Sequence, residues 1–312
     1  VFSELFSFSL NIIFYLIDRK KYINKRNLPI QMKKRIFKIA FPISITSCIR
    51  SGLSSLKQFL IPLRLSMSGM TYQMAVSGYG LISGMVMPVL LFANVFIASF
   101  SGLLVPEFSR LLAGKNTNRM KYICNTIFKS TFIFSIAMSS IFLFYGNELS
   151  ILIYQNLEAG KWLKILAPLV FFMYIDNVID NILKGINEQV SVMLCNIIDL
   201  VVTITIIFFV VPHLGMTGYI LSIFVSELLN FTISSIQLRK RIAFSINVKN
   251  ICIKPIIACI LAYGITMFFN FSFLPFLWNV VFKIAFFIGV YALIIFLFNI
   301  KGADRYYRQF HN

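Results

Sequence analysis

Charged and hydroxyl side chains gather on one side of an otherwise apolar segment, residues 39–62. At about 100° of helical rotation per residue, one half of this segment carries Ser44, Ser47, Arg50, Ser51, Ser54, Ser55, Lys57 and Gln58. The other half carries aliphatic and aromatic side chains. Arg50 stands near the middle, too far from either end for its guanidinium to reach an aqueous interface easily. The pattern predicts that one face of this helix meets water or a polar ligand.

Three further apolar segments repeat this pattern more weakly. Their polar residues are Asp176, Asn177, Asp180, Asn181 and Lys184 on one side of 163–183, then Asn196, Asp199 and Thr203 in 192–212, and Ser222, Ser226, Glu227 and Asn230 in 215–236. Charged side chains in such surroundings face a cavity or one another. For Asp180, Lys184 and Glu227, mutual pairing within a helix bundle is an equal alternative, whereas a cavity is favoured for Arg50 with Lys57. The candidate cavity residues are Arg50, Lys57, Ser47, Ser54, Gln58, Asp176, Asp180 and Asp199.

The residue types that most often perform catalysis or bind metals are scarce. The two histidines, His213 and His311, stand in a short turn and next to the C-terminus, outside the apolar segments. A membrane acyltransferase or metalloprotease would therefore lack its usual base or ligand. The five cysteines are scattered and form no CxxC pair, so we expect small buried hydrophobes and no disulfide framework or zinc site. We expect that the protein is not an enzyme and that it binds no metal or cofactor.

Composition fixes the class of protein that must position these side chains. Of 312 residues, 58% are hydrophobic and 13% charged, against about 45–50% and 25% in soluble domains. Thirty-four Phe and a mean hydropathy of +0.82 need more interior than a soluble chain of this length encloses. Disorder requires low hydrophobicity and is also excluded. The prediction is an all-α, polytopic membrane helix bundle.

Eight segments are long and apolar enough to be read as membrane spans. They lie near 39–62, 79–105, 130–146, 163–183, 192–212, 215–236, 251–270 and 278–300. Residues 1–17 are shorter and resemble the tail of a helix whose beginning is missing, so we expect the C-terminal part of a longer protein. The prolines Pro42 and Pro62 are expected to kink or end the first full span.

Lys and Arg concentrate on alternate connections between the predicted spans. Most of the 29 fall in 18–38, 106–129, 184–191, 237–254 and 301–312, whereas the opposite connections hold Arg64, Lys161 and Lys164. By the positive-inside rule the basic connections and the C-terminus are cytoplasmic. The net charge of +18 is therefore a topology signal, and no nucleic-acid partner is expected. Segment 18–38 fits either an amphipathic stretch held by anionic membrane lipids or a solvated loop.

The order of several short motifs resembles one known family. Ala-Phe-Pro-Ile (40–43) and Leu-Ile-Pro-Leu-Arg (60–64) are followed by Ser-Gly-Tyr-Gly (77–80), Pro88 and Leu-Val-Pro-Glu (104–107). Leu-Ala-Pro (166–168) and Gly-Met-Thr-Gly (215–218) come next. This order resembles the stage V sporulation protein B branch of the polysaccharide flippases, in the superfamily of lipid II flippases and multidrug-and-toxin-extrusion transporters. The likeness covers most of residues 30–245.

The resemblance implies the second half of a two-lobed, fourteen-span transporter. Residues 1–17 would end a truncated helix and 18–38 would form a cytoplasmic basic linker. Residues 39–245 would form a six-helix lobe, and 246–312 two additional helices with a cytoplasmic tail. The implied partner is the missing N-terminal lobe, and the implied location is a bacterial cytoplasmic membrane.

The implied function is transport of a lipid-linked oligosaccharide or peptidoglycan precursor by alternating access between the lobes. Arg50 and Lys57 would neutralise its pyrophosphate, while Ser and Gln would meet its sugars. Three alternatives stay open. A cation-coupled exporter of small organic compounds would use Asp176, Asp180 and Asp199 as ion sites. The others are an inactive flippase fragment and a membrane-integral enzyme of envelope synthesis.

Overall fold

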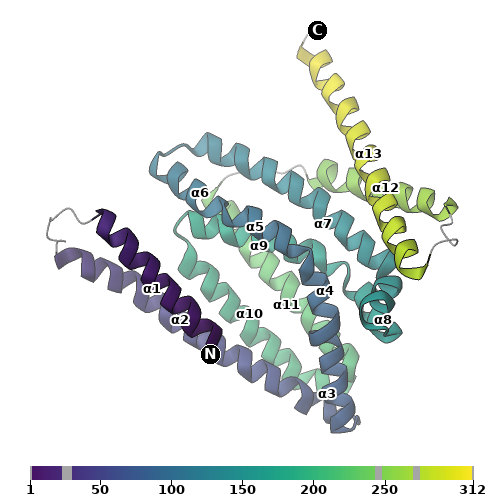
Figure 1. Cartoon of the computed structure of the whole chain (residues 1–312), viewed down its shortest axis with the longest axis horizontal. Coiled ribbons are helices and arrows are strands. Elements are labelled where there is room, and N and C mark those ends of the chain that lie inside the picture. Colours follow the sequence, from purple (N-terminus) through teal and green to yellow (C-terminus); the bar gives the residue numbers. More distant parts are fainter. Residues whose placement is uncertain (1, 23–29, 243–247, 270–274, 311–312) are drawn as a thin grey trace. The chain divides into compact units, whose positions relative to one another are not determined.

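The computed structural model describes residues 2–22, 30–242, 248–269 and 275–310, which form helices and turns without a strand (Figure 1). The helices are α1 (Phe2–Tyr22), α2 (Ile30–Ser66), α3 (Tyr72–Gly80), the π-helical segment η1 (Leu81–Val86), α4 (Met87–Phe92), α5 (Asn94–Gly102), α6 (Leu104–Ala113), α7 (Thr117–Tyr154), α8 (Leu157–Leu166), α9 (Leu169–Gly185), α10 (Gln189–Phe209), α11 (Val211–Arg241), α12 (Val248–Phe268) and α13 (Phe276–Phe310). The expected all-α polytopic bundle is confirmed.

The chain divides into two compact units, Val1–Ile45 and Thr46–Asn312. In the first unit, α1 exposes its apolar side chains from Leu5 to Ile17. The expected linker 18–38 overlaps the end of α1 and the start of α2, and its residues 23–29 lie outside the described residues. The second unit contains α2 from Thr46 onward and all later helices.

Prolines account for several interruptions in the second unit. Pro88 has no N–H for the carbonyl of Gly84, and the backbone widens into η1, where Met87 donates to the carbonyl of Ile82, five residues back. Pro106 likewise leaves Gly102 without its α-helical donor, and α5 ends at Gly102. Helices α8 and α9 meet beside Pro168 at a bend of 58°. By contrast, α2 continues past both Pro42 and Pro62, so neither proline ends the helix, and the alternative expectation of a kink stays a prediction.

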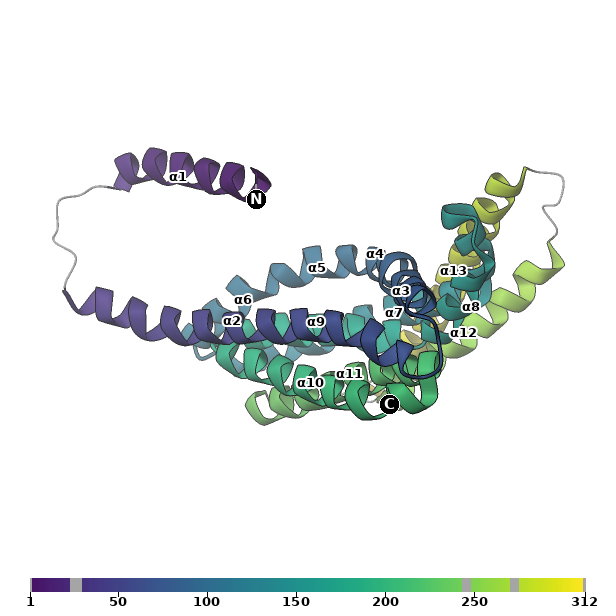
Figure 2. The ribbon, with the colours of Figure 1, turned by 90° about the horizontal axis from the view of Figure 1, so that it is seen from below.

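A glycine makes the turn between α10 and the main part of α11. Gly215 has φ +56° and ψ −131°, outside the helical region that surrounds it. A Cβ atom here would lie 3.0 Å from Oγ of Ser68, so the left-handed backbone and the close neighbour both favour glycine. In Figure 2, α10 and the rest of α11 run side by side.

The boundaries of the spans differ from those expected. Among the described residues, six helices are long and apolar enough to cross a membrane, or seven if α8 and α9 form one span. The predicted segment 79–105 is divided into two such stretches, Tyr72–Phe92 and Asn94–Ala113. The apolar part of α12, Cys252–Phe268, is shorter than a span, and α2 is not among the six. Its charged and serine residues lower its hydropathy.

Three buried clusters stabilise the second unit. One surrounds the fully buried Tyr174, whose hydroxyl donates to the carbonyl of Leu90 at 2.7 Å. A second joins α6, α7, α9 and α11 around Phe108 and Phe128. The third attaches α12 and α13 to α7, with the ring of Tyr263 stacked on Phe144 at 3.8 Å. Helix α9 takes part in the first two clusters, and the candidate acidic residues lie on it.

The cysteines follow the expectation with one exception. Cys124, Cys195 and Cys259 are buried and Cys252 is partly buried. Cys48 is exposed, so its expected burial is wrong. It lies on α2, where both the polar and the apolar side chains are widely exposed.

Candidate functional site: a charged cluster between four helices

Asp176 on α9 is the most deeply placed of the predicted site residues, with 7% of its surface exposed. Its Oδ2 accepts a hydrogen bond of 2.7 Å from Nδ2 of Asn230 on α11. Its Oδ1 is buried without a hydrogen bond among the described residues, and the side chain of Ser234 on α11 also interacts with the carboxyl group. Asp180, Asp199 and Glu227 are all close enough to interact with it electrostatically. Four carboxyl groups from three helices therefore converge at this point.

The cations of α2 and α9 border this acidic group. Asp180 is within electrostatic range of Arg50 and of Lys184, one turn along its own helix. Lys57 is within range of both Asp199 and Glu227. Three cations thus accompany four carboxyl groups. In the described part of the chain, the direct ion pairs are Glu107–Arg110 and Glu188–Arg241, so the charges of the cluster interact at longer range.

Asp199 on α10 is held by one residue of α11. Oγ of Ser226 donates to its Oδ1 at 2.7 Å. Its backbone carbonyl accepts from Thr203 at 2.8 Å, so this threonine satisfies its own helix. Asn196 likewise donates to the carbonyl of Val192. The i, i+3, i+7 pattern on α10 therefore supplies one side chain, Asp199, to the cluster.

The polar face of α2 is open. Ser47, Arg50 and Gln58 are exposed, and Ser54 and Lys57 are partly buried. The apolar half is also open, with 68% of Phe59 exposed. Burial on α2 is greatest at Ile61 and Leu65 near its C-terminal end. Along most of its length α2 therefore presents Arg50, Ser47 and Gln58 on an accessible surface.

Two of the predicted neighbours of Asp176 belong to a different network. Asn181 donates to Oγ of Ser101 on α5 at 2.8 Å, and Ser101 donates to Oδ1 of Asn177 at 2.9 Å. These amides attach α9 to α5, whereas Asp176 and Asp180 meet the charges of α2, α10 and α11. The side of this helix that the sequence predicts to be polar therefore makes two different sets of contacts. Asn177 directly follows Asp176 and Asn181 directly follows Asp180, and adjacent residues of a helix point about 100° apart around its axis.

Sequence reasoning also missed Ser101 and ranked Ser226 and Asn230 below the carboxylates that they bind. The spacing of Ser226 and Asn230, one helical turn apart on α11, was the available signal. For Ser101 the sequence shows only a serine before a glycine in an apolar helix, and nothing identifies the helix that it faces. Within the described ranges, no group of three or more His, Cys, Asp or Glu side chains is arranged to hold a metal ion.

Long apolar helices with charged side chains buried between them define a multi-pass membrane protein. Comparison with known families is more specific. The MatE family model matches residues 42–209, more than half of the chain, and the chain belongs to the MatE family. The family expected from the order of motifs is thus confirmed. The matched region begins within α2 and extends to the end of α10. It contains Arg50, Asp176 and Asp199.

One curated relative is similar over most of the chain. It is the stage V sporulation protein B of Bacillus subtilis (strain 168), 24% identical over 251 residues. The alignment covers 77% of this chain and 48% of the relative. The chain therefore spans about half the length of the curated relative that it matches.

Proposed function

We propose that this chain forms the second lobe of a MatE-family flippase that moves a lipid-linked sugar precursor across the bacterial cytoplasmic membrane. The observation that carries the proposal is the position of Arg50. It lies within the stretch of α2 that the sequence predicts to be a membrane span and is exposed, and among the described residues no carboxylate forms a direct ion pair with it. A cation in this position is costly unless an anion or water meets it.

The chemistry of the cluster suits an amphiphile with a pyrophosphate group. Arg50 and Lys57 would neutralise the pyrophosphate, and a guanidinium can bind it through two parallel hydrogen bonds. Asp180 and Asp199 would act as longer-range counter-ions while the site is empty. Ser47, Ser54 and Gln58 would meet the sugars, and the isoprenoid chain would stay in the lipid.

The other wall of the cavity would come from a first lobe, because α2 leaves both its polar and its apolar side chains exposed. Alternating access would then be a rocking of the two lobes about the cluster. In this arrangement the basic connections and the C-terminus face the cytoplasm. Residues 39–245 form the lobe and 246–312 the two additional helices.

A second candidate function is a cation-coupled exporter of small organic compounds. Asp176 favours it, because this aspartate has an unbonded buried oxygen and three acidic neighbours. Such a group can exchange a proton or a cation during transport. The two candidates differ in the charged residue of the protein that transport requires. The flippase requires a cation on α2, and the exporter requires a carboxylate on α9.

The proposal is tested by binding of an isoprenyl-pyrophosphate-linked disaccharide to the protein joined to a first lobe. Replacing Arg50 by Ala removes an interaction with a charged group of about 1.5–3 kcal/mol, and the affinity should fall by at least about tenfold. Arg64→Ala is the matched control, because Arg64 lies on the same helix over the ring of Phe208. Unchanged affinity in Arg50→Ala, or an equal loss in Arg64→Ala, contradicts the flippase. Loss of ion-driven dye efflux in Asp176→Asn alone would favour the exporter.

A further inference from the structure

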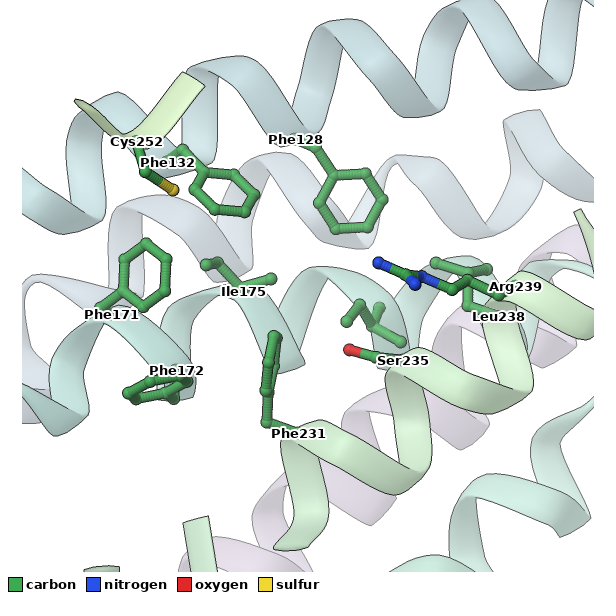
Figure 3. Close-up of a pocket in the computed structure, with 11 residues that line it drawn as sticks. Phe128, Phe132, Phe171, Phe172, Ile175, Phe231, Ser235, Leu238, Arg239 and Cys252 are labelled. Carbon is green, nitrogen blue, oxygen red and sulfur yellow. The ribbon is translucent and has the colours of Figure 1, made fainter. Parts of the chain in front are cut away.

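A cavity of about 300 Å³ lies between α7, α9, α11 and α12, outside the charged cluster (Figure 3). Its volume is at the lower end of the range of about 300–1,000 Å³ that is typical of ligand pockets. Ile175 and Ile179 of α9 line it, whereas Asp176 and Asp180, one residue further along in each case, belong to the charged cluster. The cavity and the charged cluster thus use different faces of α9.

Five of the eleven residues that line the cavity are phenylalanines. Phe128 and Phe132 come from α7, Phe171 and Phe172 from α9, and Phe231 from α11. The rings contact one another edge to face: Phe132 and Phe171 at 5.1 Å between centroids, and Phe172 and Phe231 at 5.2 Å. Such a lining offers no partner for a polar group and suits a hydrocarbon chain.

The end of α11 supplies the polar side of the same cavity. In Figure 3 the guanidinium of Arg239 is directed into the space, and Ser235 also lines it. Arg239 begins the basic run Arg-Lys-Arg that ends α11. Arg241 is paired with Glu188, but among the described residues no carboxylate pairs with Arg239. An exposed cation that forms no direct ion pair with a described carboxylate therefore lies beside a hydrocarbon-lined space.

We propose that this cavity binds one acyl chain of an anionic phospholipid, with the lipid phosphate at Arg239. The chain would lie among the phenylalanine rings, and the phosphate would bind the guanidinium, which holds phosphate through two hydrogen bonds. The positive-inside rule assigns the basic end of α11 to the cytoplasmic leaflet, where anionic lipids collect at basic residues. The lipid would bridge α11 to α12, since Cys252 of α12 also lines the cavity.

A tryptophan placed in the cavity can report whether a lipid chain enters it. Phe172→Trp is made in the full chain after the two native tryptophans, Trp162 and Trp278, are changed to Phe. The purified protein is placed in bilayers that contain brominated-chain phosphatidylglycerol or brominated-chain phosphatidylcholine at equal mole fraction. Bromine quenches tryptophan fluorescence only over a short range, so the signal reports on this site.

Phosphatidylglycerol should bind about fivefold more tightly than phosphatidylcholine, the equivalent of about 1 kcal/mol for one basic residue. Arg239→Gln should remove this preference, and the matched control Lys240→Gln, which changes the next residue on α11, should keep it. Elution as a single species in size-exclusion chromatography shows that each variant is folded.

Four outcomes would overturn the proposal. They are equal quenching by the two lipids in the parent, an unchanged preference in Arg239→Gln, relief of quenching by inorganic phosphate alone, and stronger competition by an isoprenyl phosphate than by phosphatidylglycerol. The third would show an anion site without a chain, and the fourth would assign the cavity to an isoprenoid.

Discussion

Asn230 on α11 is the direct hydrogen-bond partner of Asp176 on α9, with 2.7 Å between Nδ2 and Oδ2. The two residues stand 54 positions apart in the chain, and Asp176 is buried. The amide therefore holds a carboxyl group in place inside the bundle, and it joins the two helices that carry most of the cluster.

Replacing Asn230 by Leu should destabilise the protein, because Oδ2 of the buried Asp176 would then lose its amide donor. An unsatisfied buried polar group costs about 1–3 kcal/mol, and the melting temperature in detergent should fall accordingly. The double variant Asp176→Leu with Asn230→Leu should recover part of the loss, since it removes both polar groups. Additive losses in a double-mutant cycle would show that the two side chains do not stabilise each other.

Arg50→Ala should leave the protein level and the melting temperature close to those of the parent. Arg50 is exposed and forms no direct ion pair among the described residues, and such long-range surface interactions are worth about 0–1 kcal/mol. The check is the amount of membrane-inserted protein together with a melting curve. A large fall in protein level that Asp180→Asn restores would instead assign Arg50 to a structural ion pair.

Gly185→Ala should destabilise the contact between α9 and α6. A Cβ at this position would lie 2.8 Å from Cβ of Phe108 and 2.9 Å from the carbonyl oxygen of Val105. Overpacking of this kind costs about 1–3 kcal/mol. Gly264→Ala on α12 is the control, because its Cβ would meet nothing within 4 Å, and helix propensity should make it neutral or slightly stabilising. Equal melting temperatures for the two variants would contradict the predicted steric conflict.

Cysteine labelling should place Lys115 and Glu158 on opposite sides of the membrane. Lys115 is exposed in the turn before α7 and Glu158 is exposed in the first turn of α8, and the distribution of Lys and Arg predicts that Lys115 is cytoplasmic. In a cysteine-free background, a membrane-impermeant maleimide added to intact cells should label Glu158→Cys and leave Lys115→Cys unlabelled until the cells are opened. External labelling of Lys115→Cys would reverse the orientation.

Hydropathy and helical spacing predict the all-helical fold and the family well, because both depend on composition and on the order of motifs along the chain. The grouping of Asp176 with Asp199 was predicted in part, because each is a charged residue within an apolar helix and such residues face the interior of the bundle. The separation of Asn177 from Asp176 was not, since it depends on which neighbour lies beside each face of α9. The end of α5 at Gly102 was missed because its cause lies four residues further along the chain. There Pro106 lacks the N–H that the carbonyl of Gly102 would accept from.

The π-helical segment η1 has a consequence for the phase of the helices on either side of it. A π turn contains one more residue than the α-helical frame, and at 3.6 residues per turn one residue corresponds to a rotation of about 100°. Through η1 and on both sides of it, four fully buried side chains follow one another at intervals of seven, four and four residues. They are Ala75, Ile82, Val86 and Leu90, and deleting one residue from η1 would turn α3 against α4 so that their buried stripes no longer coincide.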